Sequence, residues 1–263
     1  MAEHISGSED AFVAKMNEKA QVLGMKHTHF VNCCGLDADG HYTSARDIAL
    51  MSRELITNHP DIFHYTTIWM ENITHVTKRG ESEFGLSNTN KLIKNYKGAT
   101  GLKTGSTSLA LYNLSASATR DDLSLIAVIM KAPSTKVRFA EAQKLLDYGF
   151  GKFAFKSFGN KDDLIKTINV SKGVKSQVDV VLENNSGALI EKNKINQVSQ
   201  SINLSDNISA PISAGQKLGE ATFSLDDKIV ASVNLVAKSD VPKLNLFTMS
   251  KRVIYSWVDL LRS

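Results

Sequence analysis

The chain has 263 residues, which is enough for one large domain or two smaller ones. It is 42% hydrophobic and 22% charged, a composition that fits an ordinary globular protein. The net charge is +4, and the lysines are spread along the chain without an arginine-rich run. This balance fits a protein that faces an anionic surface, and it argues against nucleic acid as a partner.

Three helices in the first 150 residues are predicted from their N-capping serines. Ser8, followed by two acidic residues, predicts a helix whose apolar residues recur at helical spacing as far as Gly24, which can end it. Ser44 predicts the start of a second helix, and Ser134 the start of a third that runs through Leu146.

A β-hairpin is predicted between the second and third of these helices. Strand-like runs at 113–120 and 123–130 flank Asp121-Asp122, which suits a tight turn. Because helices then accompany an antiparallel sheet, the predicted fold class of residues 1–150 is α+β.

The character of the sequence changes after residue 150. Residues 151–163 are rich in Gly, Phe and Lys, and they are predicted to be a junction. Short β-branched runs follow, among them 178–182 and 229–236, and turn signals separate them. We therefore predict a small all-β domain over 164–240.

An amphipathic helix is predicted over 244–262. Apolar residues cover about half of a helical wheel, and Lys251, Arg252 and Arg262 lie on the other half with one acid, Asp259. The stretch is too short and too polar on one side to span a bilayer, so we expect it to lie in the membrane surface. Packing on the β domain or self-association are the alternatives.

The cysteines and histidines give no sign of a metal site. Cys33 and Cys34 are adjacent, and neighbouring cysteines rarely bridge each other because a disulfide needs a larger Cα separation. We expect two free, packed thiols. The histidine pairs at 27 and 29 and at 59 and 64 lack zinc-helix spacing, so no metal is predicted.

The string Lys103-Thr104-Gly105 is the candidate for chemistry. On the edge strand of a serine acyl-transferase site, such a lysine attracts a substrate carboxylate and the threonine donates a hydrogen bond to it. The glycine lets the substrate lie along the strand. A three-residue string is common by chance, however, and by itself it also fits a turn with a solvated lysine.

The surrounding sequence resembles the low-molecular-mass penicillin-binding proteins, the serine-type D-alanyl-D-alanine carboxypeptidases. Six ordered groups of residues carry the resemblance, which covers nearly all of 1–150 and continues more loosely to the end. These groups are 2–5 with 7–9; 23–25 with 28–32 and 35–36; 42–49; Asn88-Thr89-Asn90-Lys91-Leu92; 101–105; and 138–141 with 145–150.

The resemblance implies a partial serine β-lactamase/transpeptidase-like domain, followed by the all-β domain and the amphipathic helix. It implies hydrolysis of the terminal D-Ala of peptidoglycan stem peptides through an acyl-serine intermediate, trapping by β-lactams, and no cofactor. It places Lys103, Thr104, Gly105 and Ser106 in one wall of the substrate cleft, and Arg138 as a weaker candidate that supports the carboxylate charge.

The sequence departs from the family pattern at the nucleophile. No serine stands three residues before any lysine, so the family's Ser-x-x-Lys motif is absent. Its Ser-x-Asn motif would precede Met1, and Ser205-Asp206-Asn207 lies in the β domain, where an exposed turn is expected. We therefore expect an N-terminally truncated chain that has no catalytic residue and is inactive alone.

The resemblance also predicts a location. The family works on the outer face of the cell membrane, and we expect this chain to be peripheral there, although it shows no export signal. A serine β-lactamase and a non-catalytic peptidoglycan-binding or scaffold protein are the alternative functions. The β domain and the amphipathic tail argue against the β-lactamase.

Overall fold

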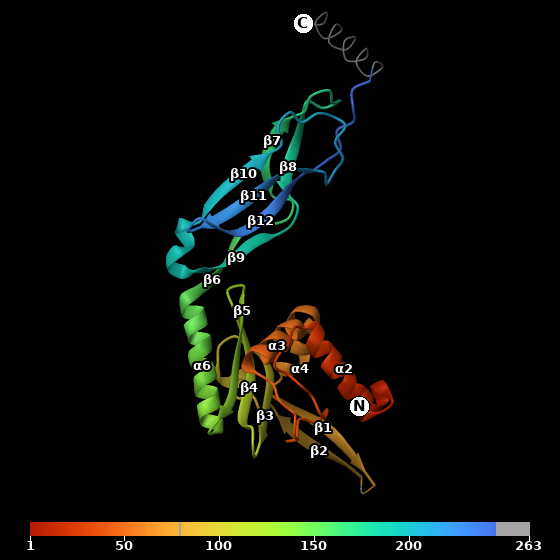
Figure 1. Cartoon of the computed structure of the whole chain (residues 1–263), viewed down its shortest axis with the longest axis vertical. Coiled ribbons are helices and arrows are strands. Elements are labelled where there is room, and N and C mark those ends of the chain that lie inside the picture. Colours follow the sequence, from red (N-terminus) through yellow and green to blue (C-terminus); the bar gives the residue numbers. More distant parts are fainter. Residues whose placement is uncertain (79, 246–263) are drawn as a thin grey trace, which may run out of the picture. The chain divides into compact units, whose positions relative to one another are not determined.

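The computed structural model describes residues 1–78 and 80–245 (Figure 1). The chain divides into two compact units, and the boundary in the sequence lies between Lys152 and Phe153. The helices of the first unit are α1 Ala2–Ser6, α2 Glu9–Val22, α3 Ala45–Asn58, the 3-10 turn η1 Pro60–Ile62, α4 Phe63–Thr66, α5 Leu92–Asn95 and α6 Thr135–Lys152.

The three predicted N-caps are confirmed. The side-chain oxygen of Ser8 accepts from the backbone N–H of Ala11 at 3.1 Å, at the start of α2. Ser44 does the same for α3, and the N–H of Val137 donates to Ser134 Oγ at the start of α6. Each serine supplies an acceptor for a helix N–H that has no partner within the helix.

An antiparallel sheet of three strands forms the centre of the first unit. Its strands are β3 Ala99–Thr107, β4 Leu111–Arg120 and β5 Leu123–Ala132, in the order β3-β4-β5. The predicted turn is confirmed, because Asp121 and Asp122 have φ of 47° and 64°, as a two-residue hairpin turn requires.

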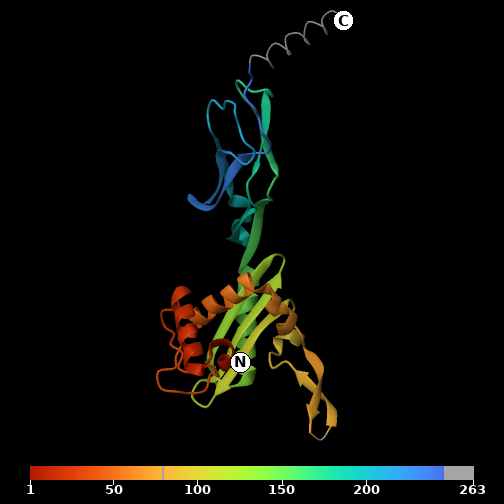
Figure 2. The same ribbon diagram turned by 90° about the vertical axis from the view of Figure 1, so that its right-hand side faces the viewer.

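Helices α6 and α3 both pack against this sheet (Figure 2). Helix α6 buries Phe139, Ala142 and Leu146, which recur at helical spacing. A Cβ at Gly149 would come within 2.5 Å of the Leu125 side chain, so the glycine permits close packing of α6 on β5. The sheet and its helices confirm the α+β class.

A second antiparallel hairpin was not predicted from the sequence. Strands β1 Met70–Thr77 and β2 Gly80–Ser87 pair along their whole length, and both are exposed throughout. Because neither face is buried, the sequence of this hairpin lacks the alternation of apolar and polar residues that marks a half-buried strand.

A buried carboxylate fixes the loop between α2 and α3. Asp47 on α3 is 1% exposed, and its Oδ2 accepts from the N–H of His27 and from Thr28 Oγ1, each at 2.7 Å. Burial acts to raise the pKa of Asp47, but hydrogen bonds from Thr28, His27 and Ser44 outweigh it and hold that pKa below its ordinary value. The carboxylate therefore ties the start of the loop to α3.

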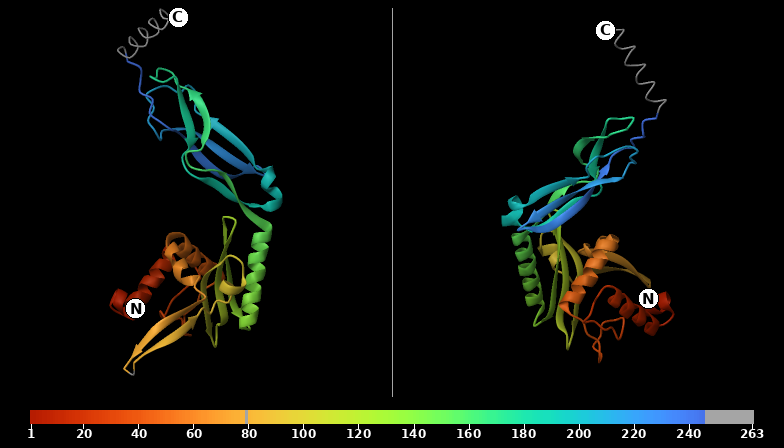
Figure 3. Two further views of the ribbon diagram at one scale, coloured as in Figure 1. Left: turned by 180° about the vertical axis from the view of Figure 1, so that it is seen from behind. Right: turned by 45° about the horizontal axis from the view of Figure 1, so that its top comes forward.

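Over its described residues, 153–245, the second unit is built from strands and one 3-10 segment, η2 Lys192–Gln197. Its five-stranded sheet has the order β10-β11-β12-β8-β7, and β6 pairs separately with β9 (Figure 3). The strands are β6 Phe153–Gly159, β7 Leu164–Asn169, β8 Gln177–Leu182, β9 Ser186–Glu191, β10 Ser199–Leu204, β11 Lys217–Leu225 and β12 Lys228–Ala237.

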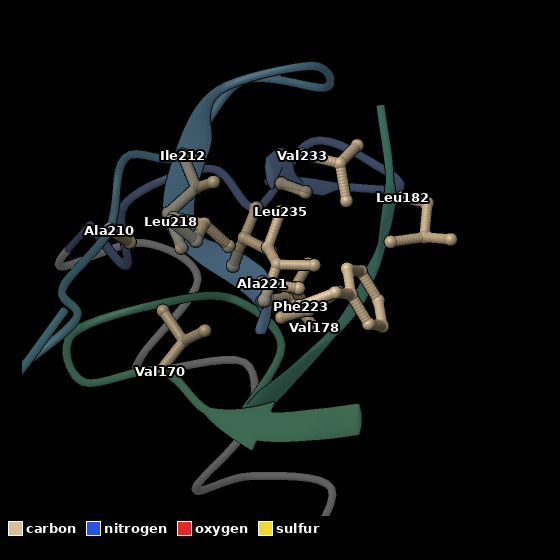
Figure 4. Close-up of a cluster of buried hydrophobic side chains, with 13 residues drawn as sticks. Val170, Val178, Leu182, Ala210, Ile212, Leu218, Ala221, Phe223, Val233 and Leu235 are labelled. Atoms are coloured by element: carbon tan, nitrogen blue, oxygen red, sulfur yellow. The ribbon is translucent and has the colours of Figure 1, made fainter. Parts of the chain in front are cut away.

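This unit has its own hydrophobic core, made of buried residues such as Val178, Leu218, Phe223 and Leu235 (Figure 4). The ring of Phe158 stacks on that of Phe223 with centroids 4.2 Å apart. Residues 151–163, predicted as a junction, contain strand β6. Phe158 is part of this strand, and its side chain packs on the hydrophobic core of the second unit.

Two further expectations have different outcomes. The cysteines are free, as predicted, but both are exposed and not packed, because they lie in an irregular surface loop between α2 and α3.

The predicted amphipathic helix lies, apart from residues 244 and 245, outside the described residues. Within the described part of the chain, no helix is long and apolar enough to cross a bilayer.

Candidate functional site

The Lys103-Thr104-Gly105 string lies on β3, which is one of the two edge strands of the three-stranded sheet. Lys103, Gly105 and Ser106 are exposed, whereas Thr104 is 7% exposed. Successive side chains of a strand point to opposite faces, and Lys103 lies opposite Ser115 of β4 in the ladder. The turn with a solvated lysine is therefore wrong, since the string is part of an extended edge strand.

Lys103 and Gly105 lie on the face of the sheet that α3 covers. The hydroxyl of Ser115, which shares that face with Lys103, is 2.7 Å from the hydroxyl of Ser52 on α3, and both serines are buried. This buried pair fixes the helix against the sheet beside Lys103.

A cleft of about 1070 Å³ opens between this face of the sheet, α3 and the loop that precedes α3. Lys103, Thr104 and Gly105 line it together with apolar side chains of α3 such as Ile48, Met51 and Leu55, and with loop residues 34–38 and 41–43. A concave, mostly apolar site with a few polar groups is typical of small-molecule binding.

The start of β3 is held by side chains from the segments before it. Thr66 Oγ1 donates to the carbonyl oxygen of Thr100 at 2.6 Å, and Asn90 Nδ2 donates to that of Gly101 at 2.9 Å. Gly101 has φ of +154°, and a Cβ there would lie 3.0 Å from the Thr66 side chain. Only glycine suits this position, where the strand passes close to α4.

Space is left open further along β3. A Cβ built on Gly105 would meet no other atom within 4 Å, so nothing in the described chain needs a glycine there for packing. Lys103 Nζ donates to the carbonyl oxygen of Thr104 at 2.5 Å, and Thr104 Oγ1 lies 2.7 Å from Thr89 Oγ1. A cation and a hydroxyl thus stand on adjacent residues of β3, next to the open position at Gly105.

Arg138 lies behind the strand, in the first turns of α6. Its Nη1 donates to the carbonyl oxygens of Gly105 at 3.3 Å and Asn113 at 3.1 Å, which are partners in the β3–β4 ladder. The side chain is buried, and burial lowers the pKa of its guanidinium. Arg138 therefore braces the backbone of Gly105 from inside the unit.

Asp37 is a residue of the site that sequence reasoning missed. It lines the cleft, and its carboxylate accepts from Thr107 Oγ1 at 2.6 Å, from Ser108 Oγ at 3.3 Å and from the N–H of Leu109 at 3.4 Å. The hydrogen bond from Thr107 lowers the pKa of Asp37. The loop before α3 is thereby tied to the end of β3.

No sequence signal of the string itself points to Asp37 or Thr89, because they lie 66 and 14 residues from Lys103 in the chain. Within residues 1–78 and 80–245, no cluster of His, Cys, Asp and Glu side chains is suited to hold a metal ion. At residues 103–106 of β3 the side chains supply an ammonium group and hydroxyls, which suit an anion, whereas the Asp37 carboxylate lies at the end of the strand against Thr107.

Two family models match the chain. The first is described as D-alanyl-D-alanine carboxypeptidase and matches residues 1–134. The second is described as the C-terminal domain of penicillin-binding protein 5 and matches residues 153–243.

Individual relatives cover nearly the whole chain. D-alanyl-D-alanine carboxypeptidase DacF of Bacillus subtilis is 38% identical over 98% of this chain and 65% of its own length. DacA of Haemophilus influenzae is 35% identical over 94% of this chain and 62% of its own length. The chain thus spans less than two thirds of these two curated relatives.

Solved structures of penicillin-binding proteins also resemble the chain. The chain is similar to penicillin-binding protein 5 from Haemophilus influenzae, with 33% identity, a TM-score of 0.68 and coverage of 92% of this chain and 69% of that one. It is also similar to penicillin-binding protein 6B from Escherichia coli, with 31% identity, a TM-score of 0.63 and coverage of 89% and 62%.

Proposed function

This chain belongs to the D-alanyl-D-alanine carboxypeptidase family, and we propose that it forms the carboxylate-binding part of an enzyme that removes the terminal D-Ala of peptidoglycan stem peptides. One observation carries the proposal. Lys103, Thr104 and Gly105 lie on an edge strand, line a cleft of about 1070 Å³ and leave the space above Gly105 open.

The chemistry of the substrate fits these groups. A peptide ending in D-Ala-D-Ala carries a free carboxylate beside the bond to be cleaved. The Lys103 ammonium would attract this carboxylate, and the Thr104 hydroxyl would donate to it in a charge-assisted hydrogen bond. The open space at Gly105 would let the peptide backbone lie along β3. Ser106 would continue the same wall, and Arg138 would hold the Gly105 carbonyl in place.

β-Lactams are proposed as ligands for the same reason. They present a carbonyl and a carboxylate at a similar spacing, so the same edge of β3 would hold their carboxylate. The chain has no serine three residues before a lysine. An acyl-serine intermediate would therefore need a nucleophile that this sequence does not supply, and the proposed role of these residues is recognition of the substrate.

The proposal predicts that the chain binds the carboxylate end of the dipeptide. In a titration followed by backbone amide chemical shifts, N-acetyl-D-Ala-D-Ala should shift Thr104, Gly105 and Ser106. Its C-terminal amide lacks the charge and should bind about ten- to a hundredfold more weakly. Equal binding of the two ligands, or shifts confined to the second unit, would contradict the proposal.

We also propose that residues 244–262 bind the outer face of the cell membrane and hold the enzyme close to its cell-wall substrate. The sequence of this segment supports the proposal, because its three basic residues outnumber its single acid, Asp259. Each basic residue contributes about 1 kcal/mol near anionic headgroups. Trp257 suits the headgroup boundary.

Vesicle flotation tests the membrane proposal. The full chain should float with anionic vesicles, and a chain ending at residue 243 should not. The double change Val253→Asp and Ile254→Asp should abolish flotation because it places charges among the apolar residues. A full chain that stays in the soluble fraction would contradict the proposal.

The β-lactamase alternative loses support from the second family match. Residues 153–243 match the C-terminal domain of penicillin-binding protein 5, a module named for a penicillin-binding protein. We therefore assign residues 1–150 to part of the catalytic domain, and the β domain that follows to the same class of enzyme.

A further inference from the structure

A second hydroxyl lies against the threonine of the proposed carboxylate site. Thr89, in the segment between β2 and α5, places its Oγ1 2.7 Å from Thr104 Oγ1, and either oxygen could be the donor. Thr104 is buried whereas Thr89 is exposed. The proposed function of β3 gives Thr89 no role of its own, although Thr89 contacts the Thr104 hydroxyl that would bind the substrate.

The residues on both sides of Thr89 are held in place by their side chains. Asn88 Nδ2 donates to the carbonyl oxygens of Thr66 at 3.1 Å and Ile68 at 3.0 Å. Asn90 is 1% exposed, and its Nδ2 donates to the carbonyl oxygen of Gly101 on β3. The hydrogen bonds of Asn88 and Asn90 thus hold Thr89 beside β3, and its position does not depend on its own hydroxyl.

The direction of the hydrogen bond between the two threonines follows from what each group can donate. A hydroxyl carries one proton and can accept from other donors, whereas a carboxylate only accepts. If Thr104 gives its proton to a bound carboxylate, it has none left for Thr89. The contact between Thr89 and Thr104 is then kept only if Thr89 is the donor.

We propose that Thr89 is a positioning residue whose hydroxyl donates to Thr104 Oγ1 and so directs the Thr104 proton toward the substrate carboxylate. The proposal rests on the proposed function of β3. In a chain of two hydroxyl donors each bond polarises the next, which strengthens the final bond to the anion. Without Thr89, the Thr104 hydroxyl would be free to rotate away.

The effect of Thr89 should be selective for the charged ligand. A neutral C-terminal amide offers an N–H as well as a carbonyl oxygen, so it does not force Thr104 to be the donor. Loss of the Thr89 hydroxyl should therefore weaken the binding of the carboxylate more than that of the amide. If Thr89 had only a packing role, changing it would weaken the binding of both ligands alike.

The test compares variants of the full 263-residue chain in the titration with N-acetyl-D-Ala-D-Ala and its C-terminal amide. Thr89→Val keeps the shape of the side chain and removes the hydroxyl, and it should reduce the preference for the carboxylate about tenfold. Thr89→Ser keeps the hydroxyl and should retain the preference. Ser87→Ala, which removes an exposed hydroxyl two residues earlier, is the matched control and should also retain it.

The outcomes separate this inference from the proposed function. If the unchanged chain shows no preference for the carboxylate, the proposed function fails and the role of Thr89 fails with it. If the chain prefers the carboxylate and Thr89→Val keeps that preference, only the role of Thr89 is overturned. The amide spectrum of each variant reports whether it is folded, and Thr89→Ala repeats the test without a bulky branched side chain.

Discussion

Incubated with a fluorescent penicillin, the 263-residue chain is expected to keep its unmodified mass. Covalent trapping needs a serine activated by a nearby base, and no serine stands three residues before a lysine in this sequence. Intact-mass spectrometry after the incubation is the measurement. A stoichiometric penicilloyl adduct on any serine of the chain would contradict this expectation.

The second large effect is expected from Lys103→Gln. The change removes the charge and shortens the side chain by one atom, so the carboxylate of N-acetyl-D-Ala-D-Ala should bind about ten- to a hundredfold more weakly, as expected for loss of a hydrogen bond between charged groups, about 1.5–3 kcal/mol. Binding of the C-terminal amide should change much less. Amide shifts of Gly105 and Ser106 measure both affinities.

Lys131→Gln is the matched control for this variant. Lys131 lies on β5 and is among the residues that line the same cleft, but it is not part of the proposed contact. Removal of its charge should weaken the binding of the carboxylate ligand by only about a factor of two, because Lys131 contributes only to the overall positive potential of the cleft. If the two variants lose affinity equally, the proposed contact of Lys103 with the carboxylate is wrong.

Local sequence signals predicted the parts of the fold that depend on neighbouring residues. The serines at 8, 44 and 134 each cap a helix, because a cap is made within a few residues of the chain. The turn at Asp121-Asp122 was predicted for the same reason. Hairpin β1–β2 was missed because both of its faces are exposed, which leaves no apolar alternation to detect.

The candidate site divides in a similar way. Lys103, Thr104 and Gly105 were predicted from a short string and its context, and the structure places them on one edge strand, beside a cleft. Asp37 and Thr89 were missed, because their contacts with β3 join residues that are 70 and 15 positions apart. The buried position of Arg138 also depends on how α6 packs, which the sequence of its first turn does not specify.

The central claim is that the edge of β3 holds the carboxylate of the terminal D-Ala. A crystal structure of this chain with N-acetyl-D-Ala-D-Ala tests it most directly. We expect the ligand carboxylate within hydrogen-bonding distance of Thr104 Oγ1 and Lys103 Nζ, with the peptide passing over Gly105. A dipeptide bound in the cleft with its carboxylate turned away from β3, or bound only at another surface, would contradict the account.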